Sequence, residues 1–239
     1  AQRRAGQRRA VGSLAVEQVQ ASFLQPPGID HTVIEVPPLD DSELQEIQTA
    51  FPLLAVPLGN PGLREILRNP YFIDKALQIP WHAGRPLPEN ERDFRAVFWQ
   101  QIVRADHNPA NGMPRLREEA LQELAVRRAR DLSDYVPATG LNAAAIALLK
   151  QDSLVVSPDG KPLLVATAHD VLEDWAILQW IEEQHLTDET AFKALSSAIG
   201  PHPAVRRSYR KWVAELVDRD APAADRLFSA AIAQADVPA

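Results

Sequence analysis

The chain has 239 residues, of which 46% are apolar and 24% charged, a balance that excludes wholesale disorder and allows two modest domains. It contains no cysteine, which excludes a disulfide scaffold, a thiolate zinc site and a cysteine nucleophile, and which fits the cytoplasm. The net charge of −7 argues against a nucleic-acid partner held by phosphate contacts, and no apolar run reaches the roughly 18 residues that a membrane-spanning helix needs.

The sequence of residues 1–38 is typical of the end of a larger domain. A short helical pattern covers 14–24, and a β-branched run at 31–36 predicts one strand that stops at Pro37-Pro38. A lone strand needs a sheet, and the chain begins without Met. We therefore expect residues 1–38 to be the remnant or end of a larger core, and the chain to be a piece of a longer protein.

Residues 39–112 carry several helix-start signals and no strand signal. A capping asparagine stands before a proline at Asn60-Pro61 and again at Asn69-Pro70, and each pair predicts the start of a helix. Prolines exclude regular structure between Pro80 and Pro88, and an apolar stripe predicts a helix at about 89–105. This segment therefore predicts a helical subdomain.

Residues 113–186 predict a different architecture. The expected elements, in chain order, are a long helix from Met113 to about residue 135, a helix at 139–151, strands at 153–157 and 162–167 joined by a Pro158-Asp-Gly-Lys161 turn, and a helix from Asp170. Helix, helix, hairpin, helix is the order of a winged-helix domain. Only helices are expected at 187–239, so the predicted fold is mainly α with one α+β winged-helix part.

The first of these helices carries many charges of both signs. Its arginines alternate with carboxylates, as at Arg115, Arg117 and Glu119, and this mixture predicts a solvated face laced with ion pairs. The histidines lack metal-ligand spacing, and no serine lies in a nucleophile-elbow pattern, so no metal site and no catalytic residue is expected within this chain.

Two stretches, residues 60–77 and 163–176, resemble the carboxyl half of the nucleotide-binding module in STAND ATPases, signalling relatives of the AAA+ proteins. In that family the ATPase core ends in a strand and a V-x-P-L segment, similar to Val36-Pro-Pro-Leu39 here. A helical lid with a proline near the adenine follows, and then a winged helix with a Met-His-Asp or similar triplet. The resemblance implies a lid at 39–112, a winged helix at 113–186 and the start of a sensor or scaffold region at 187–239.

The resemblance also implies three nucleotide-binding residues. Pro70 would match the lid proline, His169 the histidine that faces the phosphates of ADP or ATP, and Asp170 the acid beside it. A capping box of Asp170 and Glu173 would leave His169 ahead of the positive end of a helix, where a phosphate is favoured. The plainer interpretations are a surface histidine without a ligand, a first-turn proline and a helix-capping aspartate.

No G-x-x-x-x-G-K-[ST] loop occurs in the sequence, so this chain lacks the phosphate cradle that the family's ATP hydrolysis requires. The resemblance therefore implies a regulatory part of a cytoplasmic signalling or defence ATPase. Its partners would be an upstream P-loop core of the same protein, together with sensor or effector domains or an oligomer. The ADP or ATP would be bound in the context of that whole protein.

Two other functions stay open at this point. A DNA-binding winged-helix regulator would need polar groove-reading side chains, whereas the helix at 139–151 is mostly Ala, Leu and Ile with one cation, Lys150. A helical interaction scaffold without nucleotide explains the helical segments equally well but gives the His169-Asp170 pair no role.

Overall fold

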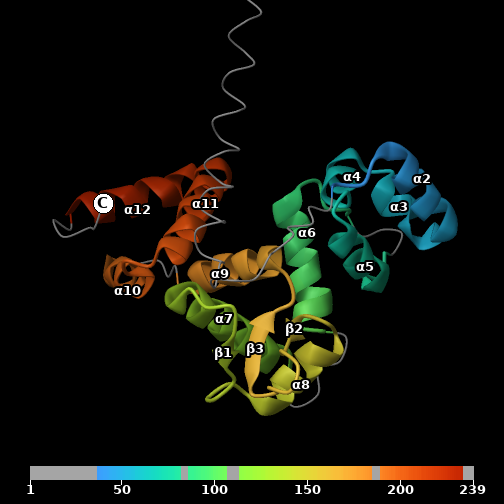
Figure 1. The fold of residues 1–239 in the computed structure, drawn as a ribbon. Helices are drawn as coiled ribbons and strands as arrows, with labels where there is room; N and C mark the ends of the chain where they lie inside the picture. Colours follow the sequence, from blue (N-terminus) through green and yellow to red (C-terminus); the bar gives the residue numbers. More distant parts are fainter. Residues whose placement is uncertain (1–36, 82–85, 107–112, 185–188, 234–239) are drawn as a thin grey trace, which may run out of the picture. The chain divides into compact units, whose positions relative to one another are not determined.

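Helices make up most of the described part of the chain, which comprises residues 37–81, 86–106, 113–184 and 189–233 of the computed structural model (Figure 1). The expected mainly α fold with a small sheet is confirmed. The helix and strand expected at 14–24 and 31–36 lie outside the described residues. Residues 39–239 form one compact unit.

Seven short helical elements precede residue 107 in the described part of the chain. They are α2 (Asp41–Ala50), the 3-10 turn η1 (Pro52–Leu54), α3 (Ala55–Leu58), α4 (Pro61–Ile66), α5 (Pro70–Gln78), α6 (Glu91–Phe98) and the π-helical turn η2 (Trp99–Val103). The predicted starts of α4 and α5 are confirmed. The Asn60 side chain accepts the Leu63 N–H at 3.1 Å, and the Asn69 side chain accepts the Tyr71 N–H at 3.0 Å.

The second group of elements builds the sheet. It comprises α7 (Met113–Asp131), β1 (Val136–Pro137), α8 (Ala143–Gln151), β2 (Val155–Val156), β3 (Leu164–Thr167) and α9 (Asp170–Gln184). The three strands are antiparallel in the order β1-β3-β2, with Val136 opposite Val165 and Val155 opposite Thr167. The turn between β2 and β3 is confirmed, since the Lys161 N–H donates to the Pro158 carbonyl at 3.1 Å.

Strand β1 was not expected, because the sequence predicts helix up to about residue 135. Helix α7 instead ends at Asp131, and Leu132 takes a left-handed conformation with φ of 49° that turns the chain away from the helix axis. Pro137 has no N–H to donate, which suits the edge position that β1 occupies beside β3. The two hairpin strands are also shorter than predicted.

The expected solvated face of α7 is only partly correct. Arg115 and Glu119 form an exposed i, i+4 ion pair at 2.7 Å. Arg117 and Glu118, by contrast, are only 3% and 5% exposed. The reason is that α7 packs against α8, α9, α11 and the sheet, so that neighbouring elements cover most of its circumference.

Three helices complete the described chain, namely α10 (Glu189–Ile199), α11 (Pro203–Arg219) and α12 (Ala221–Ala233). Helix α11 packs against α7 and α9, and α12 packs against α11 and α10. Among the described residues, no helix combines the length and the apolar character needed to cross a membrane.

An aromatic cluster joins α5, α6 and α9. Trp175 of α9 is 1% exposed and stacks on Phe72 of α5, with ring centroids 4.9 Å apart and an interplanar angle of 7°. Phe94 and Phe98 of α6 meet the same indole edge-on, at 6.0 Å and 5.5 Å. The segments predicted as lid and winged helix therefore share one hydrophobic core.

Ion pairs link α6 to α11. Both terminal nitrogens of Arg95 donate to the Glu215 carboxylate, at 3.1 Å and 2.5 Å. Glu91 accepts from Lys211 at 2.9 Å and from the Trp175 indole at 3.0 Å. Burial by itself raises the pKa of Glu91, but the hydrogen bonds from Lys211 and Trp175 outweigh it and hold that pKa below the ordinary value.

We expect Glu91→Gln to lower the melting temperature at pH 7 by about 2 °C and to have no effect near pH 3. A carboxyl whose pKa is lowered by folding stabilises the fold above its unfolded pKa of about 4.3, and this contribution is lost as the pH falls through the folded pKa. Thermal melts of both proteins between pH 3 and pH 8 test this, with the exposed Glu89→Gln as control. An equal loss at both ends of the range would show that charge is not the cause.

Candidate functional site

The starts of α5 and α9 meet at a stacked pair of rings. The Tyr71 and His169 ring centroids are 4.6 Å apart, with an interplanar angle of 20°. Tyr71 directly follows Pro70, the exposed first residue of α5, and His169 directly precedes Asp170, the first residue of α9. The neighbourhoods of the three predicted site residues are thus brought together, and Tyr71 makes the contact.

His169 is the residue that caps α9. Its Nδ1 accepts the Val171 N–H at 3.2 Å, and its carbonyl accepts the N–H groups of Leu172 and Glu173 at 3.0 Å and 3.2 Å. Because Nδ1 is an acceptor, the neutral ring carries its proton on Nε2. A half-buried histidine in this state keeps one N–H donor beside the positive end of a 15-residue helix.

The expected capping box of Asp170 and Glu173 is wrong. Asp170 is already helical and exposed, and the first helical bonds are accepted one residue earlier, by His169. The Glu173 side chain pairs instead with Arg128 of α7, which also donates to the Thr167 hydroxyl at 2.6 Å. Burial raises the pKa of Glu173, and the Arg128 charge opposes that rise.

Tyr71 lies in a polar environment that the sequence analysis missed. Its hydroxyl is buried and has no hydrogen-bond partner among the described residues, and burial together with the Asp74 charge raises its pKa. The Lys75 ammonium lies 5.6 Å from the Tyr71 ring centroid, pairs with Asp74 at 2.9 Å and donates to the Asp152 carbonyl at 3.2 Å. The available signal was the i, i+4 spacing of Tyr71 and Lys75, which places both on one face of α5.

This arrangement can bind an anion more readily than it can perform a reaction. It offers an imidazole N–H beside the start of α9, whereas Lys75 is engaged by Asp74 and the Asp152 carbonyl. The exposed Asp170 adds a negative charge that opposes a phosphate at the same helix end. No cluster of His, Asp or Glu suited to a metal ion occurs within the described ranges. Comparison of the chain with known protein families and with curated proteins gave no match.

Proposed function

We propose that residues 39–186 are the helical lid and winged helix of a STAND-type signalling or defence ATPase of the cytoplasm, followed by the start of a sensor or scaffold region. In this proposal the upstream P-loop core binds and hydrolyses ATP. The lid and winged helix hold the ADP-bound protein in a closed, inactive state until nucleotide exchange releases it.

The observation that carries the proposal is the Tyr71–His169 stack. The resemblance requires the lid proline Pro70 and the histidine His169 to face one nucleotide, although they are far apart in sequence. The stack places Tyr71, the neighbour of Pro70, against His169, and the Nε2–H of His169 is a suitable donor to a phosphate oxygen.

Two further features support the proposal. The sheet order β1-β3-β2, with α7, α8 and α9 around it, is compatible with a winged helix (Figure 1). The stack also lies next to the aromatic cluster, because Tyr71 contacts Phe72 edge-on at 5.5 Å and Phe72 stacks on Trp175. A change at the nucleotide would therefore reach the shared core through packed rings.

The first experiment measures ADP retained by the parent protein, including its P-loop core, after purification. We expect His169→Ala to reduce retention by about tenfold or more, since a hydrogen bond to a charged group is worth about 1.5–3 kcal/mol. His169→Asn should lose ADP as well while keeping the helix cap, because asparagine is a strong capping residue. His202→Ala is the matched control, since His202 also stands directly before a helix but makes no side-chain cap bond.

Loss of ADP from both His169 variants, with unchanged thermal stability of the asparagine variant, is the expected result. If the wild-type parent carries no nucleotide, or if both variants retain it fully, the nucleotide role is refuted. The chain would then be better described as a helical interaction scaffold. No geometric feature of the described residues favours the DNA-binding alternative, and the one cation of α8, Lys150, donates to the Pro162 carbonyl at 3.0 Å.

A further inference from the structure

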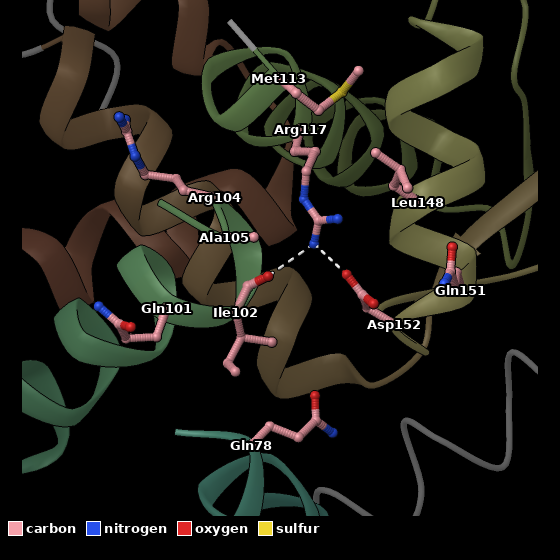
Figure 2. A pocket seen from close by; sticks show the side chains of 10 residues that line it. All are labelled: Gln78, Gln101, Ile102, Arg104, Ala105, Met113, Arg117, Leu148, Gln151 and Asp152. Carbon is pink, nitrogen blue, oxygen red and sulfur yellow. Dashed lines mark hydrogen bonds and ion pairs between the residues drawn. The ribbon is translucent and has the colours of Figure 1, made fainter. Parts of the chain in front are cut away.

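A second candidate site lies where α5, η2, α7 and α8 come together (Figure 2). It is an open pocket of about 320 Å³, at the lower end of the range found for small-molecule sites. Its lining is formed by Gln78, Gln101, Ile102, Arg104, Ala105, Met113, Arg117, Leu148, Gln151 and Asp152. None of the three predicted nucleotide-binding residues takes part.

Arg117 is the buried cation of this pocket. Its Nε donates to the Val103 carbonyl at 2.7 Å, and its Nη2 donates to the Ile102 carbonyl at 2.8 Å and to the Asp152 carboxylate at 2.6 Å. The other terminal nitrogen, Nη1, has no hydrogen-bond acceptor in the part of the chain that the structure describes. Figure 2 shows it directed toward the side of the pocket formed by Leu148. A rigidly held guanidinium thus presents unused N–H donors to the pocket.

The opposite wall has an irregular backbone. The turn η2 is π-helical, with the Arg104 N–H donating to the Trp99 carbonyl at 2.8 Å, and Ala105 follows with a φ of 54°. Both features cost free energy and are concentrated at functional sites in proteins. Here they bring the final carbonyls of η2 to Arg117, which fixes the position of its guanidinium.

The charges of the pocket select among ligands. Arg104 pairs with Asp106 at 3.1 Å and with Glu118 at 2.5 Å, and Figure 2 shows its guanidinium directed away from Arg117, so Arg117 is the cation that faces the pocket. Its partner Asp152 lies close enough to repel a dianion such as phosphate more strongly than a carboxylate, whose single negative charge can accept the N–H donors of Nη1. The amides of Gln101 and Gln151 add donors and acceptors at either side.

We propose that this pocket binds a small organic monocarboxylate that also carries an amide or hydroxyl group. The carboxylate would bind Arg117, and the second polar group would bind Gln101 or Gln151. The lining residues come from elements before and after residue 112 in the sequence. A bound molecule would therefore stabilise the packing of α5 and η2 against α7 and α8. This proposal does not depend on the nucleotide function.

The test is a thermal-shift measurement on the full chain with matched probes. Lactate and N-acetylglycine supply the carboxylate, and lactamide and N-acetylglycinamide replace it with a neutral amide. At a hundredfold excess over the dissociation constant, we expect a carboxylate to raise the melting temperature by about 5–10 °C. The neutral amides should produce no comparable shift.

Two neighbouring glutamines provide the variant and its control. Gln101→Leu removes a lining amide and should weaken carboxylate binding, measured by calorimetry, by about tenfold. Gln100→Leu changes an exposed neighbour outside the pocket and should leave binding unchanged. The proposal is overturned if no carboxylate shifts the melting temperature, if amides or inorganic phosphate act equally well, or if Gln101→Leu and Gln151→Leu both bind as the wild type does. The isolated chain suffices, so these outcomes are independent of ADP retention by the parent protein.

Discussion

Replacing Trp175 with alanine is expected to lower the free energy of unfolding by about 3–5 kcal/mol. The side chain is 1% exposed and contacts Phe72, Phe94 and Phe98, which come from two helices other than its own. Its removal leaves a cavity among aromatic rings that cannot close without moving α5 or α6. Against a total stability of about 5–15 kcal/mol for an ordinary domain, this loss is severe.

Urea denaturation followed by far-UV circular dichroism measures the effect. Trp180→Ala is the matched control, because Trp180 lies on the same helix but is only half-buried at the margin of the core, with the Arg130 guanidinium 5.8 Å from its ring centroid. We expect that variant to lose about 1 kcal/mol. Equal losses for the two variants would show that the aromatic cluster is not the centre of the fold.

Replacing Gly62 with alanine is expected to destabilise the protein by about 1–3 kcal/mol, although alanine favours helices by about 1 kcal/mol over glycine. A Cβ at this position of α4 would lie 2.1 Å from the Glu89 carbonyl oxygen and 2.9 Å from its carbon. Both atoms are backbone, so the segment before α6 has to move. The steric cost therefore exceeds the gain in helix propensity.

Gly59→Ala serves as the comparison for this prediction. Gly59 has an ordinary φ of −74°, and its added Cβ would approach only the Ala55 carbonyl oxygen closely, at 3.2 Å. We expect a change within about 0.5 kcal/mol, measured by the same urea titration. If Gly62→Ala were as stable as Gly59→Ala, the close approach of Glu89 to α4 would not exist in solution.

Local chemistry explains what the sequence predicted well. The starts of α4 and α5 depend on an asparagine side chain and a proline within three residues, so they are readable without the rest of the chain. Strand β1 depends on pairing with β3, nearly thirty residues later, and a two-residue strand has no pattern of its own. Only the tertiary structure could reveal it.

In the candidate sites too, features set by the local sequence could be predicted, whereas contacts between distant segments could not. The sequence predicted that His169 stands at the start of a helix but gave the capping role to Asp170, because nothing in the sequence shows that Arg128 of another helix binds the Glu173 side chain. The Tyr71 contact joins distant segments and has no signature in either one. Arg117 was assigned to a solvated face, since a charged residue in a charged helix gives no sign that η2 and Asp152 will enclose it.

Asp152 accepts hydrogen bonds from Lys75 and from Arg117, and a mutation of Asp152 affects the two bonds differently. Lys75 donates to the backbone carbonyl of residue 152, which every amino acid supplies, whereas Arg117 depends on the carboxylate itself. A substitution at 152 would therefore keep the hydrogen bond from Lys75 of α5 and would remove only the ion pair with the Arg117 guanidinium. Among natural variants of this chain we therefore expect residues 117 and 152 to change together, and Lys75 to be retained whatever residue stands at 152.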